Sequence, residues 1–248
     1  MKILLNGATG KMGNELIKYI EKQENLKIVS GIGENINKNF NFPIYKNANE
    51  INENIDVIID FSKPQATMNT LEYAIEKNIP MVIATTGLSN EQLDKIKKAS
   101  LKIPIFISAN MSLNINLMAK IVKEIAKVLQ NAEIEIVETH HNRKIDAPSG
   151  TALLLANAIN EVFENTKNYN FNRMQTKNPR DKNEIGFSSI RGGNIVGKHT
   201  VLFYSENETL EITHQAYNRQ VFAIGAIEAA KFLIKQNPGL YNMNDLVK

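Results

Sequence analysis

The sequence predicts a doubly wound α/β domain built on a parallel sheet, with a second, α+β domain inserted into it that contains a mixed or antiparallel sheet. In residues 1–111, short continuous apolar runs alternate with amphipathic helical patterns, which is typical of a parallel sheet covered on both faces. Between residues 186 and 217, three strand patterns follow one another without a helix between them. The last helical pattern, 221–235, is rich in small residues that suit close packing, and we expect it to return to the first domain.

The apolar periodicity places the elements of the first domain. The expected strands are residues 2–6, 27–32, 57–61, 81–84 and 105–107, and the expected helices are 11–22, 65–77 and one that opens at Ser89. Pro64 suits the first turn of the second helix. Ser89 and Gln92 form a capping-box pattern at the start of the third.

The second domain has its own pattern. Its expected helices are residues 114–130 and 152–163, and its expected strands are 132–141, 186–191, 195–204 and 209–217. In the first of these strands Ile134 and Ile136 alternate with glutamates, so one face of that strand is expected to be exposed. Residues 165–183 are rich in Asn, Lys and Arg, and they are predicted to form a mobile loop.

The composition excludes several kinds of chemistry. The chain has 248 residues, a net charge of +3, no cysteine and four histidines. Without cysteine there is no disulfide, thiolate metal site or cysteine nucleophile, and so few histidines give no reason to expect a metal. The small charge gives none to expect a nucleic-acid partner. No apolar run resembles a targeting segment or the ~20 residues of a membrane span, so we expect a cytoplasmic protein with no membrane partner.

Three glycines follow the first predicted strand in the pattern G-x-x-G-x-x-G, at Gly7, Gly10 and Gly13. Such a turn lets backbone amides approach a pyrophosphate at the amino terminus of the next helix. Glu34 comes about 20 residues later, at the end of the second strand, where an acidic residue accepts hydrogen bonds from an adenosine ribose. The motif therefore predicts a dinucleotide cofactor.

The expected cofactor is NADH or NADPH. The carboxylate of Glu34 favours NADH because it repels a 2′-phosphate, whereas Lys11 and Lys38 could pair with that phosphate. We accordingly assign residues 1–111 and 219–248 to a dinucleotide-binding domain, and residues 112–218 to a domain that binds the substrate.

Two of the four histidines lie together, at His140 and His141, and Lys144 follows them. A histidine can move a proton at neutral pH, and a lysine adds a positive charge and hydrogen-bond donors. This cluster therefore predicts acid–base chemistry beside an anionic group. The other two histidines, His199 and His214, are expected on exposed strand faces without a functional role.

A helix start follows the cluster directly. Ser149 comes after Pro148 and is expected to cap the helix, so that Gly150 and Thr151 lie in its first turn. The amino terminus of a helix favours a carboxylate or a phosphate. The segment therefore predicts an anion site next to the proton-transferring histidine.

At this segment the chain resembles the 4-hydroxy-tetrahydrodipicolinate reductase (dihydrodipicolinate reductase) family. The family pattern E-x-H-H-x-x-K-x-D-A-P-S-G-T-A is matched by residues 138–152, and the resemblance extends over essentially the whole chain. Supporting matches are residues 7–13, 60–62, 84–87, 109–112, 190–193 and 197–200. The resemblance implies a Rossmann-type domain with an α/β substrate domain, a homotetramer built through the second domain's sheet, and reduction of a cyclic dicarboxylate by NAD(P)H in lysine and diaminopimelate biosynthesis.

The resemblance also implies residue roles. His140 would be the catalytic acid–base and Lys144 the proton donor. The substrate contacts would be His141, Lys144, Ser149, Gly150 and Thr151. The cofactor contacts would be Gly7, Ala8, Thr9, Gly10, Lys11, Met12, Glu34, Ala84, Thr85, Thr86, Ser108, Ala109, Asn110 and Met111.

Two positions depart from the family pattern. Ala84 and Asn114 stand where the family commonly has glycine. Ala84 is next to the expected nicotinamide, and Asn114 is at the expected hinge.

A short-chain dehydrogenase is suggested only by the spacing of Tyr73 and Lys77, which an ordinary amphipathic helix explains. A non-catalytic NAD(H) sensor would not need acid–base groups beside an anion site.

Overall fold

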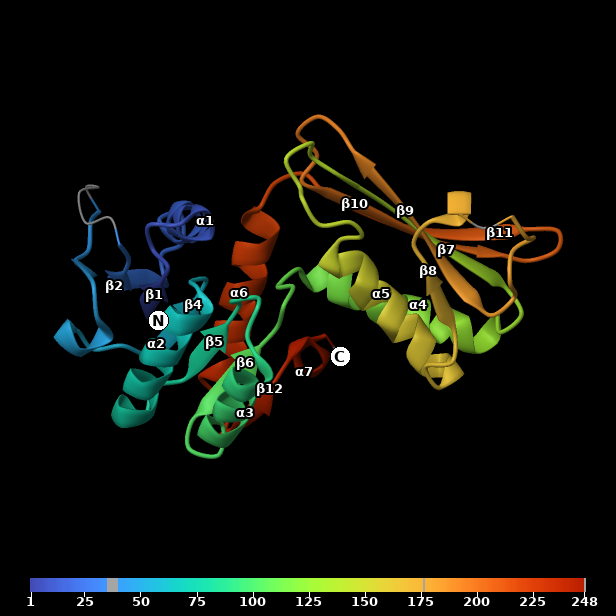
Figure 1. Cartoon of the computed structure of the whole chain (residues 1–248). Helices are drawn as coiled ribbons and strands as arrows, with labels where there is room; N and C mark the ends of the chain where they lie inside the picture. Colours follow the sequence, from blue (N-terminus) through green and yellow to red (C-terminus); the bar gives the residue numbers. More distant parts are fainter. Residues whose placement is uncertain (35–39, 176, 248) are drawn as a thin grey trace. The chain divides into compact units, whose positions relative to one another are not determined.

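The computed structural model describes residues 1–34, 40–175 and 177–247 (Figure 1). The chain divides into two compact units: Met1–Leu113 with Arg219–Lys248, and Asn114–Asn218. The first contains a seven-stranded parallel sheet and the second a five-stranded mixed sheet. The predicted fold class is therefore confirmed.

The sheet of the first unit is covered by helices on both faces. Its strands, in spatial order, are β12 (Gly239–Tyr241), β6 (Pro104–Ile107), β5 (Met81–Ile83), β4 (Val57–Asp60), β1 (Lys2–Asn6), β2 (Lys27–Ile32) and β3 (Ile44–Tyr45). On one face α1 (Lys11–Ile20), α6 (Gln220–Leu233) and α7 (Met243–Leu246) pack over Ile3, Leu5 and Val82. On the other, α2 (Pro64–Lys77) and α3 (Asn90–Ala99) pack over Leu4 and Ile58.

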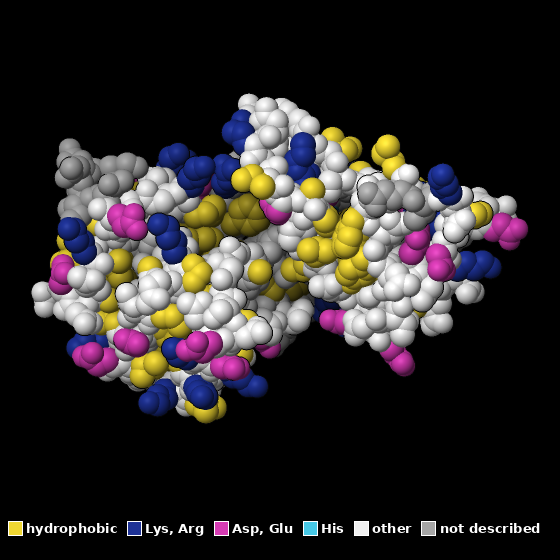
Figure 2. All heavy atoms as spheres, in the orientation of Figure 1, with side chains coloured by type: hydrophobic (Ala, Val, Ile, Leu, Met, Phe, Trp, Pro, Cys, Tyr) yellow, Lys and Arg dark blue, Asp and Glu magenta, His cyan; other side chains and the backbone are white. Residues whose placement is uncertain are grey.

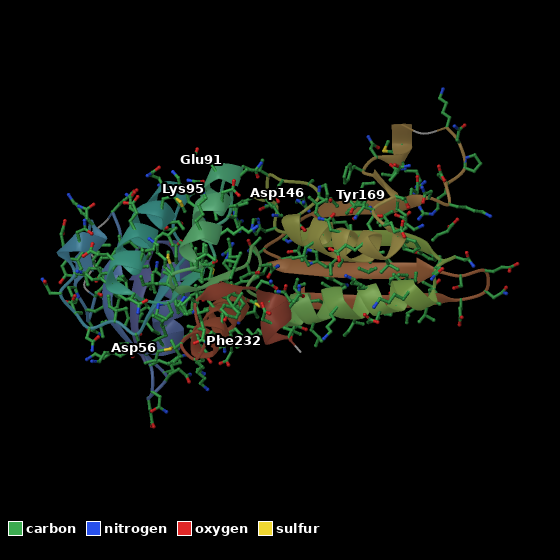
Figure 3. All side chains as sticks on the ribbon, turned by 90° about the horizontal axis from the view of Figure 1, so that it is seen from below. Asp56, Glu91, Lys95, Asp146, Tyr169 and Phe232 are labelled. Carbon is green, nitrogen blue, oxygen red and sulfur yellow. The ribbon has the colours of Figure 1, made fainter. Side chains whose placement is uncertain are left out.

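The alternation of side-chain direction along these strands explains why helices cover both faces of the sheet. Neighbouring residues of a strand point to opposite faces, and here both sets are apolar, so helices must cover both faces. Phe232 of α6, labelled in Figure 3, packs edge-on against Phe106 of β6 and Tyr241 of β12, with ring centroids 6.4 and 5.6 Å apart. These contacts attach the three-residue strand β12 to the edge of the sheet.

The second unit has a sheet with helices on one face. The strand order is β11 (Thr209–Ala216), β10 (Gly197–Tyr204), β7 (Glu133–His140), β9 (Glu184–Arg191) and β8 (Asn168–Asn170). Helices α4 (Leu113–Val128) and α5 (Gly150–Asn160) bury Ile134, Ile136 and Phe203. The predicted alternation of β7 is confirmed, since its even-numbered side chains are buried and its odd-numbered ones are half-exposed.

The predicted helix starts are confirmed. Pro64 occupies the first turn of α2, and Ser89 and Gln92 form the reciprocal capping box of α3. Ser149 caps α5, where its Oγ accepts a hydrogen bond of 3.2 Å from the amide of Ala152. Such caps satisfy amides that have no acceptor within the helix.

The prediction of a mobile loop over residues 165–183 is wrong in part, because the described part of this segment contains β8 and a 3-10 helix, Arg173–Gln175. The β8 strand pairs parallel to β9, and the hydroxyl of Tyr169 donates to Asn157 of α5 at 2.6 Å (Figure 3). Arg180 also pairs with Glu135 and Glu184, both at 2.8 Å. A three-residue strand is too short to show a sequence period, and the polar composition of the segment favours a loop. The sequence therefore carries no signal for β8.

None of the described helices has the length and apolar character needed to cross a membrane. The face drawn in Figure 2 carries both basic and acidic side chains over the two units.

Candidate active site

The glycine turn after β1 has the geometry that a phosphate-binding loop requires. Gly7 has a φ of +83°, and a Cβ there would lie 2.6 Å from the carbonyl oxygen of Phe61. A Cβ on Gly13 would overlap the carbonyl of Gly7, so this glycine lets α1 begin directly against the turn. Gly10 is the N-cap residue of α1. The sequence needs glycine here for conformation and for space.

A pocket of about 740 Å³ opens beside this turn, and its lining includes Gly7, Thr9, Gly10 and Glu34. Lys63 also lines it, and its Nζ lies 3.4 Å from Oε1 of Glu34. Both side chains are exposed, so the pair is free to rearrange around a ligand at little cost.

The other residues of the predicted turn lie differently. Ala8 is fully buried in the core, and Lys11 and Met12 are the first residues of α1 and are not among the residues that line this pocket. Lys38 lies outside the described residues.

The remaining predicted cofactor residues follow β5 and β6. Ala84 and Thr85 are buried, Thr86 is exposed, and the segment Ser108–Met111 is held by hydrogen bonds between the Ser108 hydroxyl and the backbone of Asn110. In that segment Ala109 is exposed and Met111 is buried. Parallel strands end at the same edge of a sheet, so these segments lie at the edge where β1 ends, which is where doubly wound sheets bind ligands.

A buried carboxylate that sequence reasoning missed orders this edge. Asp60, at the end of β4, is fully buried and accepts hydrogen bonds from Thr67 at 2.6 Å, Thr85 at 3.0 Å and the amide of Ser62 at 3.0 Å. Burial raises the pKa of Asp60, and these hydrogen bonds oppose that effect. The carboxylate thus ties the turn after β4 to the turn after β5.

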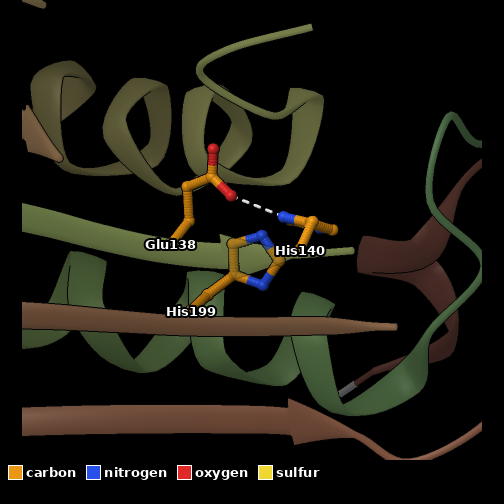
Figure 4. A group of neighbouring side chains, drawn as sticks. All are labelled: Glu138, His140 and His199. Atoms are coloured by element: carbon orange, nitrogen blue, oxygen red, sulfur yellow. Dashed lines mark hydrogen bonds and ion pairs between the residues drawn. The ribbon is translucent and has the colours of Figure 1, made fainter. Parts of the chain in front are cut away.

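In the second unit, Glu138 and His140 share the helix-covered face of β7 because they are two residues apart on a strand. The Nδ1 atom of His140 lies 2.5 Å from Oε2 of Glu138 (Figure 4). Arg191 of β9 donates to both oxygens of Glu138, at 2.7 and 2.9 Å. The amide of Ser149 donates to Oε1 at 3.2 Å.

These contacts keep Glu138 ionised and orient His140. Burial by itself raises the pKa of Glu138, but hydrogen bonds from Arg191, Ser189 and His140 outweigh it and hold this pKa at about 2. The ionised carboxylate can only accept, so Nδ1 of His140 donates and Nε2 is left for proton transfer. Burial lowers the pKa of His140, although Glu138 opposes the shift.

The prediction for His199 is wrong, because this residue is only 4% exposed and lies in the site. Its ring meets that of His140 edge-on, with centroids 5.0 Å apart (Figure 4), and its Nε2 lies 3.0 Å from the Ser149 hydroxyl. The buried face of β10 is the one that carries Gly197, His199 and Val201, and it packs toward the helices. Burial lowers the pKa of His199 to about 3.

This low pKa predicts an acid-sensitive fold. His199 binds a proton in the unfolded chain below its ordinary pKa of 6.5 but not in the folded one, so stability present above pH 6.5 is lost as the pH falls toward 3. Between pH 6.5 and 5 the loss from this residue is about 2 kcal/mol. We expect urea unfolding of a His199→Phe variant to show a correspondingly flatter pH dependence. Glu138 titrates below this window, so equal slopes in variant and wild type would contradict the prediction.

Glu138, His140 and His199 offer ligand atoms within 4.8 Å of one another, as a metal site would. Arg191, however, already donates to both carboxylate oxygens. A divalent cation would have to lie beside this guanidinium or displace it. The grouping is therefore better explained as a hydrogen-bonded proton-transfer site, and the chemistry proposed below uses no metal.

Lys144 and the start of α5 complete the cluster. The Nζ atom of Lys144 lies 2.8 Å from both carboxylate oxygens of Asp146, on the loop between β7 and α5 (Figure 3). His141 follows directly on β7, where its amide donates to the carbonyl of Ile195 at 2.8 Å. Gly150 and Thr151 form the first turn of α5, next to the Ser149 cap. The predicted residues of this unit are thus brought to one end of β7.

Besides His199, sequence reasoning missed two members of this site, Glu138 and Arg191, although both lie in the segments that carry the family resemblance. The spacing of Glu138 and His140 was a usable signal, since residues two apart on a strand share a face. The position of Arg191 was not predictable, because it depends on the parallel register that places it opposite His140.

Comparison with known proteins identifies the family of the chain. Residues 1–111 match the family model "Dihydrodipicolinate reductase, N-terminus", and residues 114–247 match "Dihydrodipicolinate reductase, C-terminus". The chain is 48% identical over 248 residues to 4-hydroxy-tetrahydrodipicolinate reductase of Caldanaerobacter subterraneus, covering 100% of this chain and 98% of that one. It is 44% identical over 247 residues to the enzyme of that name from Brachyspira hyodysenteriae, covering 100% of both chains.

Solved structures show the same fold. Dipicolinate-bound dihydrodipicolinate reductase from Paenisporosarcina sp. TG-14 superimposes with a TM-score of 0.81 at 24% identity, covering 98% of each chain. A myo-inositol dehydrogenase from Corynebacterium glutamicum gives a TM-score of 0.61 at 14% identity, covering 100% of this chain and 92% of that one. With two family models that together span nearly its whole length, and relatives well above 40% identity, the chain belongs to the dihydrodipicolinate reductase family.

Proposed function

We propose that this protein reduces 4-hydroxy-tetrahydrodipicolinate to tetrahydrodipicolinate, with loss of water, in lysine and diaminopimelate biosynthesis. One observation carries the proposal: His140, hydrogen-bonded to a buried ionised carboxylate, lies beside Lys144 and the capped start of α5. A proton-transferring group next to cationic and helix-terminal donors suits a dicarboxylate that gains a proton as it is reduced.

The cofactor would bind to the first unit, which we propose as the dinucleotide-binding domain. The turn at Gly7, where any Cβ would meet the Phe61 carbonyl, and the pocket lined by Thr9 and Glu34 fit a dinucleotide. When bound, NADH or NADPH supplies the hydride. The segments 84–86 and 108–111 are proposed to lie against the nicotinamide half.

The substrate would bind to the second unit. Lys144 and His141 contribute donors for one carboxylate, and the first turn of α5 at Ser149, Gly150 and Thr151 favours the same charge. Proton transfer is assigned to Nε2 of His140 and to the ammonium of Lys144. A dicarboxylate suits this site. In support, the solved structure of the related Paenisporosarcina enzyme has dipicolinate bound.

The direct test follows NADH absorbance after 4-hydroxy-tetrahydrodipicolinate is generated enzymatically in the presence of the purified protein. We expect absorbance to fall only when protein and substrate are both present. Binding of NADH without turnover would contradict the proposal and favour a sensor of the cofactor.

Glu34 is expected to set the preference between the two cofactors. In a Glu34→Gln variant the charge that repels a 2′-phosphate is lost, and Lys63, now 3.4 Å from Glu34, becomes available to that phosphate. We expect kcat/KM for NADPH, relative to NADH, to rise about tenfold, the change that ~1.4 kcal/mol gives.

The matched control is Glu91→Gln on α3, which removes a similar exposed ion pair, to Lys95 at 3.0 Å (Figure 3). It should leave the cofactor ratio unchanged. An unchanged ratio in the Glu34 variant would mean that this carboxylate does not face the ribose.

We further propose that the second unit's sheet forms a homotetramer and that the enzyme is cytoplasmic. The sheet face away from α4 and α5 carries Ile190 and Tyr204, 51% and 40% exposed. Light scattering on purified protein tests the assembly, and a monomer at micromolar concentration would contradict it.

A further inference from the structure

The register between β7 and β9 places an ion pair, Glu138 with Arg191, next to the proton-transferring histidine His140. In the parallel pairing of β7 with β9, His140 lies opposite Arg191 and Glu138 opposite Ser189. Glu138 has a side chain only 1% exposed, and that of Arg191 is 19% exposed. A buried ion pair of this kind is weak evidence for stability, because desolvation offsets the attraction, so its place in the site calls for another explanation.

Both oxygens of Glu138 are fully engaged. Oε2 faces Nδ1 of His140 at 2.5 Å and Nη1 of Arg191 at 2.9 Å. Oε1 accepts from Nη2 of Arg191 at 2.7 Å and from the amide of Ser149 at 3.2 Å. One carboxylate therefore contacts the histidine of the proton site and the cap of the anion site together.

Arg191 extends this connection to the loop that carries Lys144. Its Nη2 also donates to the carbonyl of Asp146 at 2.6 Å, and Asp146 in turn contacts Lys144 through its carboxylate. The ion pair thus joins β7, β9, the loop after β7 and the start of α5.

We propose that Glu138 and Arg191 are positioning residues for the proposed reaction: Glu138 fixes the ring of His140 with Nδ1 protonated and Nε2 reactive, and Arg191 keeps Glu138 ionised and aligned with the anion site. The expected changes in kcat and in the pH profile rest on the proposed function. Neither residue needs to touch the substrate, since each acts through His140 or the loop.

The pKa of His140 depends on the charges around its ring, so it distinguishes a positioning role of Glu138 from a role in packing alone. The titratable and charged groups near its ring are Glu138 on β7, Arg191 on β9 and Lys144 on the following loop. The ring of His199 on β10 also faces it, and His199 pairs with His214 on β11. Among these only Glu138 stabilises the protonated ring. Removing its charge must therefore lower the pKa of His140.

The experiment compares Glu138→Gln, Arg191→Met and the double variant Glu138→Leu/Arg191→Met. We expect Glu138→Gln to lower kcat about tenfold or more, a part of the 10²–10⁴-fold that general acid–base catalysis contributes. The limb of its kcat/KM profile that reports His140 should move about one pH unit lower. Arg191→Met should lower the thermal midpoint as well as kcat, because it leaves a buried carboxylate without its partner.

The double variant separates positioning from stability. Apolar replacement of both partners of a buried pair restores stability in other proteins, so its thermal midpoint should return toward that of the wild type while kcat stays at least about tenfold low. The matched control is Arg180→Met, which removes a similarly buried arginine that pairs with Glu184 at the other end of β9. It should lower the thermal midpoint without changing kcat or the pH profile.

Recovery of kcat together with stability in the double variant would overturn the proposal, as would an unchanged pH profile in Glu138→Gln. Nitrogen-15 NMR of the histidines in the ligand-free protein tests the inference without any catalytic turnover, because it reports which ring nitrogen of His140 carries the proton. We expect His140 protonated at Nδ1 in the wild type and a mixture of tautomers in the double variant, and a mixture in the wild type would contradict the proposal. If the wild type consumes no NADH, the proposed function fails, while the NMR result still decides the positioning role.

Discussion

His140→Gln is expected to lower kcat by about 10²–10⁴-fold, the range that a positioned acid–base group contributes. The fold should survive, because the glutamine amide can still donate a hydrogen bond to Glu138, and the surrounding helices cover apolar strand positions that do not change. KM for NADH should also stay near its wild-type value, since the glycine turn lies in the other unit. Steady-state NADH oxidation at saturating substrate measures the effect.

The control for this variant is His214→Gln. His214 is a half-buried histidine on β11 whose pKa is also lowered by burial, yet no hydrogen bond or ion pair joins it to Glu138. It should retain kcat within about threefold, the effect of under 1 kcal/mol on the barrier. Equal losses in the two variants would show that histidine burial, rather than proton transfer at His140, supports turnover.

Lys144→Ala is expected to lower kcat/KM for the substrate by about 10³-fold, because it removes both a charge-assisted contact to a carboxylate and a proton donor. Lys144 is held toward the site by the carboxylate of Asp146, 2.8 Å from its Nζ, and this contact lowers the pKa of Asp146. The variant should bind NADH normally and unfold at nearly the wild-type urea concentration.

Lys144→Arg separates the two roles. Arginine keeps the positive charge but does not release its proton at neutral pH. We therefore expect a substrate KM within about threefold of the wild type and a kcat as low as in Lys144→Ala. If Lys144→Arg kept full kcat, lysine would act only as a counter-ion.

Long periodic patterns made most of the fold predictable. The apolar runs at Leu4 and Ile58, the proline in the first turn of α2 and the caps at Ser89 and Ser149 each report a local requirement, so sequence alone locates them. The strands β3, β8 and β12 were missed because two or three residues contain no measurable period. Their positions depend on contacts such as Phe232 with Tyr241, which form only when the chain is folded.

The site was predictable where chemistry was concentrated in one segment, and not where it depended on pairing. His140, Lys144 and Ser149 are neighbours in sequence, and a helix cap beside a histidine is visible there. Arg191 and His199 reach the same place from β9 and β10 through strand register. The error over His199 shows the limit, since a shift of one residue in the assumed face turns a buried histidine into an exposed one.

The same register makes this site vulnerable to a kind of change that leaves every functional residue in place. Deleting one residue within β7 ahead of Glu138 would shift the pairing with β9 and β10 by one position, and so turn Glu138 and His140 to the uncovered face of the sheet. The motif from Glu138 to Ala152 would read as before, yet Arg191 would meet Thr139 at the position that its carboxylate partner now occupies. Length variation in relatives should therefore be absent from these three strands and confined to the turns that join them.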